Sequence, residues 1–439
     1  MLGFGCGMVT GKAGMTSHSY WINTATAFDG GAAGPVPSRA DAVVIGGGYT
    51  GLAAARALAL EGARVVVLEG ARVAQAASGR NGGQCNNGLA QDFGGMVAAY
   101  GLERARAFYR DFDDAVTTVE TIVRDEAIDC DFLRGGKLKL AAKPEHVAKL
   151  EASAKFLRRE VDSDVAFLDV AATRREVASD SFHGALLFRR SASMHVGRFG
   201  AGLAEAAARR GALLFEHAFV TRLERLGGTR YRVTSTRGVV EADRVLIATG
   251  ASEKGPFGWF RRRIVPIGSF IVATEPLPAD LRQALLPEAR TCTTTRLIGN
   301  FFRTTPDNRL IFGGRARFAL PGPRDDAKSG IVLRRSMIGM FPALAQTRID
   351  YCWGGVVDMS ADRLPHAGQH DGLFFATGFS GHGTQMSVHL GSAMAGVMLG
   401  MRSDILWDQG AWPAIAGHYG KPWFLPAVGA WYRIKDAIS

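Results

Sequence analysis

The chain of 439 residues is too long for one small domain and indicates two or three folding units. Hydrophobic residues make up 47% and charged residues 21% of it, a balance that excludes a disordered or fibrous protein. The formal net charge of +11 permits an anionic partner, but the basic residues are scattered and their densest run is only Arg261–Arg263, so we expect no nucleic-acid partner.

The start of the chain carries no targeting signal that we recognise. Residues 1–15 lack the basic start and the apolar core of a signal peptide. We expect the segment before Ser17 to be a loose tail, and either Met8 or Met15 to be the true first residue.

Cysteine usage indicates a reducing compartment. The five cysteines are odd in number and form no C-x-x-C pair, which argues against a disulfide framework and against a structural zinc site. The most apolar stretch, residues 386–401, is interrupted by His389 and Ser392 and is predicted to be an interior helix. We therefore expect a cytoplasmic protein with no membrane span and no metal site.

The first chemical motif has the order strand, glycine-rich turn, helix, strand and acid. The β-branched run Ala42–Ile45 is typical of a buried parallel strand, and the Gly46–Gly51 segment after it, GGGYTG, matches G-x-G-x-x-G. A helix is predicted over Leu52–Leu60 and a second strand over Arg64–Leu68, which ends in Glu69.

Each part of this motif has a task in binding a dinucleotide. Gly46 allows the tight turn, Gly48 lets the backbone approach a pyrophosphate, and Gly51 lets the helix pack closely on the strand. The helix N-terminus offers unpaired N–H groups to the phosphates. Glu69 can accept hydrogen bonds from ribose hydroxyls, which disfavours NADP. The alternative, an ordinary strand–turn–helix, does not explain Glu69.

The segment after Glu69 distinguishes FAD from NAD. Residues 71–84, ARVAQAASGRNGGQ, can lay backbone N–H groups along a phosphate chain and against a planar ring. The alternative is a solvated surface loop. An NAD-dependent dehydrogenase uses the same glycine fingerprint but leaves this loop without a purpose.

The rest of the chain contains further helical and strand patterns and no internal repeat. Helices are predicted over residues 97–126, 144–159 and 201–210, and strands over 137–141, 212–215, 264–274 and 309–313. The last two strands alternate like members of an antiparallel sheet.

Four segments together resemble the D-amino acid oxidase superfamily of FAD enzymes, which includes glycine, sarcosine and γ-glutamylputrescine oxidases. They are the glycine turn, the AASGRNGGQ run, residues 241–250 ending in Ala-Thr-Gly, and residues 374–383, FFATGFSGHG, with the helix after them. The resemblance extends from Ser19 to about Met401. It implies an α/β plus α+β fold, in which a Rossmann-type FAD-binding domain is interleaved with a substrate domain whose mixed or antiparallel sheet roofs the isoalloxazine.

The resemblance implies a discontinuous division of the chain. We expect an N-terminal tail over residues 1–37, and a C-terminal extension over 406–439. The FAD-binding domain is expected to comprise 38–95, 195–260 and 350–405, and the substrate domain 96–194 and 261–349.

The resemblance also implies which residues bind FAD, non-covalently. Arg80 can reach a phosphate or cap its loop, and we favour the phosphate. Val220 is expected to contact the adenine through its backbone. His382 is expected to contact the flavin through its backbone. The full expected set is Gly46, Gly48, Tyr49, Thr50, Gly51, Glu69, Gly70, Ala77, Ser78, Gly79, Arg80, Asn81, Gly82, Gly83, Gln84, Val220, Ala248, Thr249, Gly250, Gly378, Ser380, Gly381, His382, Gly383, Thr384 and Gln385.

Two departures from the family pattern narrow the range of possible substrates. Val357 stands where glycine oxidase-like members carry an Arg that clamps the α-carboxylate, and Gln385 stands where sarcosine oxidases carry a Lys. A buried carboxylate without a cationic partner costs several kcal/mol, so we expect no carboxylate held there. The γ-glutamylputrescine oxidase branch is the most similar, since it shares the Ser19–Trp21 and Met359–Pro365 segments.

Two further departures concern the flavin and its electron acceptor. Gly355 stands near the position of the cysteine that tethers FAD in sarcosine oxidases, so no covalent bond is expected there. Ile311 aligns with the Lys that assists oxygen reduction in those enzymes. Both an oxidase and a dehydrogenase with another acceptor remain open.

The expected reaction is oxidation of a C–N bond of an amine or an N-substituted amino acid to an imine, which water hydrolyses to a carbonyl and a released amine. O2 is the expected acceptor, giving H2O2, and no dedicated acid or base is required because the cofactor carries the electron chemistry. Candidate pocket residues are Asn86, Phe302, Arg303, Trp353 and His382. Arg303 can bind an anionic tail or form a surface ion pair. The alternatives are oxidation of an N-carboxymethyl amine, with Arg303 as a relocated carboxylate partner, and a flavin-binding protein without turnover.

Overall fold

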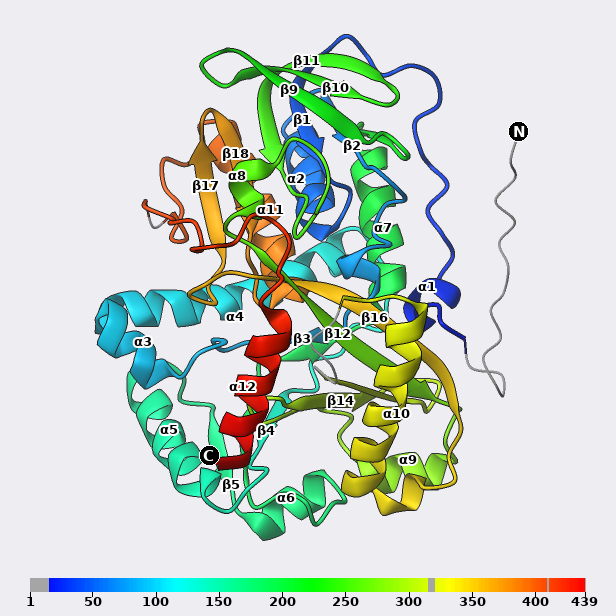
Figure 1. Cartoon of the computed structure of the whole chain (residues 1–439), viewed down its shortest axis with the longest axis vertical. Helices are drawn as coiled ribbons and strands as arrows, with labels where there is room; N and C mark the ends of the chain where they lie inside the picture. Colours follow the sequence, from blue (N-terminus) through cyan, green and yellow to red (C-terminus); the bar gives the residue numbers. More distant parts are fainter. Residues whose placement is uncertain (1–15, 315–319, 409, 439) are drawn as a thin grey trace.

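The computed structural model describes residues 16–314, 320–408 and 410–438. Most of the expected loose tail, including Met8 and Met15, lies outside these residues. Figure 1 shows two sheets, one above the other, with helices around them.

The first sheet has the strand order β17-β18-β11-β1-β2-β8, and β9 and β10 extend it as an antiparallel ribbon. β1 runs parallel to β2 and β11, and β11 runs parallel to β18. The strands are β1 (Arg39–Ile45), β2 (Val65–Leu68), β8 (Leu213–Phe215), β9 (Val220–Gly227), β10 (Arg230–Ser235), β11 (Gly238–Ile247), β17 (His366–His370) and β18 (Leu373–Thr377). The predicted Rossmann-type sheet is confirmed.

The central strands are apolar throughout because both faces of the sheet are covered. Val44 and Val67 point into a cluster with the helices α2 (Tyr49–Leu60), α7 (Val196–Arg209) and α11 (Gly383–Met398). Their neighbours Val43 and Val66 point into a second cluster on the opposite face, formed with the β9–β10 ribbon. A continuous apolar run, rather than an alternating one, is the consequence.

Helix α11 is the interior helix that the sequence predicts, and it crosses α2 at close range. A Cβ atom on Gly391 would lie 2.3 Å from the carbonyl oxygen of Thr50, so the crossing requires glycine. Within the described ranges, no helix is both long enough and apolar enough to cross a bilayer.

The second sheet is mixed, as expected, with the order β16-β12-β15-β14-β13-β4-β6-β5. β12 is antiparallel to both β15 and β16, whereas β4 is parallel to β13 and antiparallel to β6. The strands are β4 (Lys137–Leu140), β5 (Ala166–Leu168), β6 (Ala185–Phe188), β12 (Val265–Thr274), β13 (Thr291–Thr294), β14 (Asn300–Thr304), β15 (Leu310–Gly314) and β16 (Ile349–Met359).

The helix predicted over residues 97–126 is two helices, because Gly101 adopts φ +80° and ends the first of them. The remaining elements are α1 (Tyr20–Asn23), β3 (Gln84–Cys85), α3 (Phe93–Tyr100), α4 (Leu102–Asp125), α5 (His146–Glu160), α6 (Val170–Glu176), β7 (Ala192–Ser193), α8 (Gly258–Arg261), α9 (Ala279–Leu285), α10 (Pro323–Met340) and α12 (Leu425–Ile438). Two short 3₁₀ turns cover Ala77–Gly79 and Pro342–Leu344.

The largest apolar cluster lies between the two sheets and joins them. It includes Val44 and Leu246 from the first sheet, and Ile271, Ile311 and Trp353 from the second. The chain also passes repeatedly from one sheet to the other. β16 belongs to the second sheet, although residues 350–405 are expected in the FAD-binding domain; the domain division as a whole stays a prediction.

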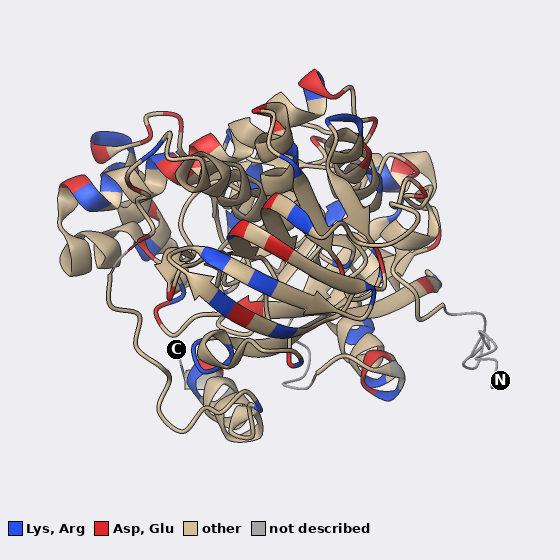
Figure 2. Ribbon diagram, turned by 90° about the horizontal axis from the view of Figure 1, so that it is seen from above, with Lys and Arg blue, Asp and Glu red and all other residues tan. Residues whose placement is uncertain are grey.

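Basic and acidic residues are interspersed along the outer ribbon. Figure 2 shows blue and red bands side by side on the strands of the ribbon. Arg222 and Glu224 of β9 pair at 2.8 Å, and Arg232 of β10 pairs with Glu241 of β11 at 2.7 Å. The net charge of +11 is therefore not gathered on this ribbon as one basic stripe.

Candidate functional site

The predicted glycine turn joins β1 to α2 at the edge of the first sheet. Gly46 has φ +108°, and a Cβ atom there would lie 2.5 Å from the carbonyl oxygen of Ala248 on the neighbouring strand end. A Cβ on Gly51 would lie 1.9 Å from the Gly46 oxygen. Both positions therefore require glycine for the reasons that the sequence motif implies.

The N-terminus of α2 is open toward this turn. Its cap residue Gly48 is extended and has no side chain of its own to cap the helix. The N–H of Tyr49 donates to the hydroxyl of Ser78 at 3.0 Å, which brings the later loop to the same helix end. Unpaired N–H groups and a partial positive charge at a helix N-terminus favour a phosphate.

Glu69 lies at the end of β2, beside the turn. Its Oε2 accepts a hydrogen bond from the N–H of Gly47 at 2.7 Å, and its Oε1 accepts one from the N–H of Ala71 at 2.8 Å. These two bonds fix the orientation of the carboxylate and leave further lone pairs for a ribose. A ribose contact stays a prediction.

The loop after Glu69 is braced by aromatic and hydroxyl groups from distant segments. The Ser19 hydroxyl donates to the carbonyl of Gly79 at 2.7 Å, the Trp21 indole N–H to that of Asn81 at 2.8 Å, and the Trp353 indole N–H to that of Arg80 at 3.0 Å. A loop held at three successive carbonyls is not a solvated surface loop. The sequence marked Ser19 and Trp21 only as shared residues and did not reveal this bracing.

Arg80 makes the loop-capping contacts, and the phosphate contact that we favoured stays a prediction. Its Nε donates to the carbonyl of Gln75 at 3.3 Å, and its Nη1 donates to that of Gly354 on β16 at 3.2 Å. The guanidinium therefore ties the loop to the second sheet.

Asn81 connects this loop to the start of α11, some 300 residues later in the chain. Its Oδ1 accepts from the N–H of Gly83 at 2.9 Å and from the hydroxyl of Thr384 at 3.3 Å, and its Nδ2 donates to the carbonyl of Ser78 at 2.9 Å. The AASGRNGGQ and GFSGHG segments, which the sequence identified separately, thus meet at one place.

Asp358 fixes the turn before α11 from the second sheet, a role that the sequence did not reveal. Its Oδ2 accepts from the N–H of Gly378 at 2.8 Å and of Phe379 at 3.3 Å, and from the hydroxyl of Thr377 at 3.3 Å. Burial raises the pKa of this carboxyl to about 6 in spite of these donors.

Two buried polar atoms at the start of α11 have no partner within the described structure. They are Nδ1 of His382 and Oε1 of Gln385, whereas the Nε2 of Gln385 donates to the carbonyl of Asn86. Burial and the nearby Lys137 lower the pKa of His382 to about 3, so its ring is neutral at physiological pH. An unpaired donor or acceptor in a protein interior is expensive, which indicates a polar ligand at this place.

Asn86 and Trp353 are engaged within the protein. Oδ1 of Asn86 accepts from the hydroxyl of Thr291 at 2.8 Å, and its Nδ2 donates to Oε1 of Gln84 at 2.9 Å. Trp353 is fully buried beneath the loop that it braces. Both side chains therefore support neighbouring parts of the site through contacts within the protein.

Phe302 is a wrong prediction for the substrate pocket, because it lies on the far face of the second sheet. It stacks on Phe312 and Phe182 in the cluster on that face. Its neighbour Phe301 points the other way, since a Cβ on Gly82 would lie 2.7 Å from its ring. Side chains alternate along a strand, so only one of the two phenylalanines can face the flavin segments.

Arg303 shares the face of Phe301 but is fully buried and not a surface residue. Its Nη2 donates to the carbonyl of Met194 at 2.7 Å and its Nε to that of Gly82 at 3.1 Å, while the guanidinium lies over the Trp21 ring at 4.9 Å. Burial lowers its pKa to about 10. The surface ion pair is therefore wrong, and these contacts favour support of the loop over binding of a substrate anion.

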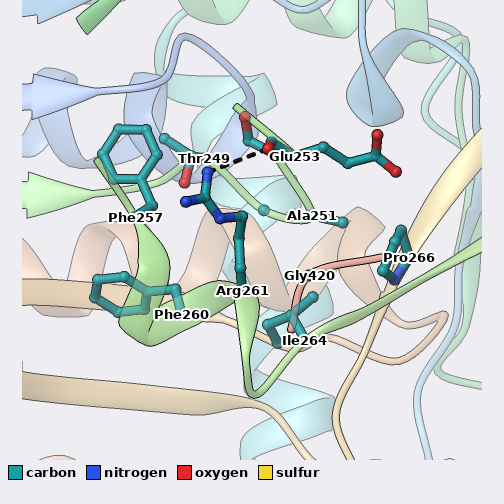
Figure 3. Close-up of a pocket in the computed structure, with 11 residues that line it drawn as sticks. Thr249, Ala251, Glu253, Phe257, Phe260, Arg261, Ile264, Pro266 and Gly420 are labelled. Atoms are coloured by element: carbon teal, nitrogen blue, oxygen red, sulfur yellow. Dashed lines mark hydrogen bonds between the residues drawn. The ribbon is translucent and has the colours of Figure 1, made fainter. Parts of the chain in front are cut away.

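A small pocket lies where β11 ends, beside the glycine turn (Figure 3). Thr249 and Gly250 line it, and Arg261 closes one side by donating to the carbonyls of Glu253 at 3.1 Å and Gly255 at 2.8 Å. Gly250 has φ +53° and no described atom within 4 Å of a Cβ built on it. The backbone at Gly250 is therefore open on the side where a Cβ would lie.

The residues present fit FAD. The N-terminus of α2, the oriented carboxylate of Glu69 and the braced loop suit the pyrophosphate and ribose. The unpartnered atoms of His382 and Gln385 suit the polar edge of a flavin ring. The loop and the start of α11 belong to one site, which we call the flavin crevice, because Asn81 connects them.

Comparison with known proteins gives the same assignment. The family described as DAO, FAD dependent oxidoreductase, matches residues 41–396. "Gamma-glutamylputrescine oxidoreductase" of Escherichia coli is 31% identical over 405 residues, which cover 91% of this chain and 93% of that protein. "Probable oxidoreductase OrdL" of Rhizobium meliloti is 30% identical over 92% and 93% of the two chains.

A solved structure, the glycine oxidase of Geobacillus kaustophilus, has a TM-score of 0.69 and 22% identity to this chain, and the match covers 87% of this chain and 99% of that one. It supports the fold alone. The family match includes the glycine turn, the braced loop and nearly all of α11. The chain therefore belongs to the DAO family of FAD-dependent oxidoreductases.

Proposed function

We propose that this protein oxidises a C–N bond of an amine, with γ-glutamylputrescine or a similar compound as substrate. The observation that carries the proposal is the flavin crevice without a cation at the two positions where relatives clamp an α-carboxylate. Val357 packs in an apolar cluster with Ile415 and Leu425, and Gln385 donates to the backbone of Asn86. A carboxylate desolvated there would lack a cationic partner.

Bound FAD would supply the acceptor for the two electrons and the hydrogen of the substrate's C–H bond. The loop at Ser78–Asn81 and the start of α11 would hold and orient it. The apolar cluster between the sheets would exclude water from the reacting carbon, and neutral His382 would offer a hydrogen bond rather than a charge. The amine R–CH2–NH2 would lose a hydride from carbon to bound FAD and a proton from nitrogen to solvent, which leaves the imine R–CH=NH. Water then converts the imine into an aldehyde and ammonia.

We propose that FAD is held without a covalent bond. The described cysteines, Cys85, Cys130, Cys292 and Cys352, are buried. Burial raises the pKa of each thiol, to about 12 for Cys130 and Cys352, so the nucleophilic thiolate is scarce at neutral pH. These free thiols also accord with a reducing, cytoplasmic location.

We propose O2 as the electron acceptor, with H2O2 as product. Ile311 lies fully buried in the cluster between the sheets, so an apolar side chain occupies the place of the oxygen-assisting Lys. Oxygen reduction would then proceed without a local cation at that position. A non-O2 acceptor is the alternative.

Anaerobic mixing of the purified holoenzyme with γ-glutamylputrescine, N-substituted glycines and simple amines tests the proposal. We expect γ-glutamylputrescine to bleach the oxidised-flavin absorbance fastest, and readmitted O2 to restore the absorbance with release of peroxide. Fastest bleaching by an N-substituted glycine would instead favour the N-carboxymethyl alternative. Bound flavin that no amine bleaches would overturn the proposal.

A further inference from the structure

A cavity of about 370 Å³ lies beside the flavin crevice, and neither the family motifs nor the proposed reaction assigns a task to it. It lies between the segment at Gly88–Gly94, helix α5 and the strands β4 and β6. Three lysines line it, Lys137 and Lys139 from β4 and Lys149 from α5, together with one carboxylate, Asp92. The cavity wall is therefore cationic with a single acidic position.

Lys137 is the most deeply placed of these groups, with only 7% of its surface exposed. Its Nζ donates to the carbonyl of Asn87 at 2.6 Å and lies 4.3 Å from the centre of the Phe188 ring. No ion pair of the described residues includes any of the three lysines. A buried ammonium without an anionic partner is costly, and its pKa is lowered to about 7, chiefly by burial and then by Lys139. An anion in the cavity would offset this cost.

The cavity and the flavin crevice lie on the same face of the second sheet. Lys139 pairs with Thr293 and Thr293 with Phe301, so Lys139 and Phe301 share one face of the sheet and stand two strands apart, about 10 Å. Phe301 touches the loop at Gly82. The charges of Lys137 and Lys139 also act on the His382 ring at the start of α11.

We propose that this cavity binds the end of the substrate remote from the oxidised amine, and that this end carries a carboxylate. Lys139 and Lys149 would bind the carboxylate, with Lys137 behind them. Asp92, which already accepts a hydrogen bond from Ser153 at 3.3 Å, would bind an ammonium on the same head group. The substrate class is thus an amine with an α-amino-acid head at its far end, and the inference rests on the proposed amine oxidation.

The length of such a substrate agrees with the spacing in the sheet. In an extended γ-glutamylputrescine, about nine bonds separate the oxidised carbon from the carboxylate, a reach of about 11 Å. A substrate of this length can place its amine by the flavin crevice and its carboxylate among the lysines. A substrate carboxylate bound far from the reacting carbon then explains both observations. It explains why the α-carboxylate clamp is absent, and why the cavity is cationic.

The test compares γ-glutamylputrescine with N-acetylputrescine, which keeps the amine and the amide but lacks the charged head. In the holoenzyme, we expect Lys139→Ala and Lys149→Ala to raise the KM for γ-glutamylputrescine by about tenfold with little change in kcat. The KM for N-acetylputrescine should stay within about twofold. Lys139→Arg should recover part of the affinity. Lys155→Ala is the matched control, because Lys155 lies on the same helix, is 76% exposed and pairs with Glu151.

Equal effects on the two substrates, or no effect on either, would overturn the subsite. A calorimetric titration with L-glutamate separates this inference from the proposed function, since it needs no turnover. Binding of glutamate to the wild type that Lys139→Ala abolishes would support the subsite even if no amine bleached the flavin. Absence of binding together with unaltered kinetics would reject the subsite and leave the amine oxidation intact.

Discussion

Asp358 is a single carboxyl that links the second sheet to the turn before α11, and its ionisation should be visible in the stability of the protein. Its pKa is about 6 in the folded chain and about 3.8 when exposed, so the folded state binds more protons between these values. Stability therefore falls as pH rises through this window, and levels off above the folded pKa. The wild type should lose about 1 kcal/mol from this group between about pH 5 and 7.

Asp358→Asn should remove this contribution, because the amide oxygen can still accept from Gly378 but cannot ionise. Denaturant unfolding of wild type and variant at the two pH values measures the difference. An identical pH dependence in both proteins would show that Asp358 does not titrate as its burial implies.

Gly51 tests the close approach on which the glycine turn depends. In Gly51→Ala the new Cβ would lie 1.9 Å from the Gly46 oxygen, so α2 must shift away from the strand end. We expect a loss of about 3 kcal/mol of stability and purification largely without flavin. Flavin content per protein and thermal unfolding measure these effects.

Gly95→Ala is the control for this change, since no described atom lies within 4 Å of its Cβ position and it lies inside helix α3. It should retain flavin and gain slight stability. Full flavin content in Gly51→Ala would contradict the geometry of the turn.

The site residues that could be predicted from the sequence are those that act through their backbone conformation. Gly46 and Gly51 are fixed by local sterics, which the motif reports directly. Arg80, Phe302 and Arg303 could not be placed in this way, because long or strand-borne side chains depend on partners far along the chain. Because side chains alternate along a strand, Phe301 and Phe302 must lie on opposite faces of the second sheet. The sequence does not show which of these faces meets the flavin crevice.

At the scale of elements, the short helix α1 matters through the loop that it braces. Trp21→Phe keeps a smaller aromatic ring but removes the indole N–H and its hydrogen bond to the Asn81 carbonyl. We expect the free energy that stabilises the loop in its binding conformation to fall by about 1 kcal/mol, which raises the Kd for FAD about fivefold. Titration of the apoprotein with FAD, followed by flavin fluorescence, measures it.

Trp431→Phe serves as the control, because Trp431 is 54% exposed on α12. Its affinity for FAD should match that of the wild type. Equal affinity in Trp21→Phe would mean that the loop keeps its shape without the indole.

The elements themselves were largely predictable. β1 and β2 are β-branched apolar runs on either side of the glycine turn and the Ala-Leu helix α2, and α7, β12 and β15 carry a periodic apolar pattern. The break at Gly101 could have been anticipated from glycine in a helical run. The pairing of β16 with β12 could not, because the two strands are far apart in sequence and no local pattern records which sheet a strand joins.

At the scale of the whole molecule, the two sheets share one apolar cluster. We expect holoenzyme unfolding to be a single cooperative event, since each sheet would lose the apolar cluster on its inner face without the other. Release of flavin, loss of far-ultraviolet circular dichroism and tryptophan fluorescence should share one midpoint in a denaturant titration. Separate midpoints would show that the sheets unfold independently.

The pairing of β1 with β11 can form only late in synthesis of the chain. Roughly 200 residues separate these parallel neighbours, so at about 10 residues per second β1 leaves the ribosome some 20 seconds before its partner. During that interval its valine-rich edge is exposed. A nascent chain of this kind is a natural client for chaperones that shield apolar strands until translation is nearly complete.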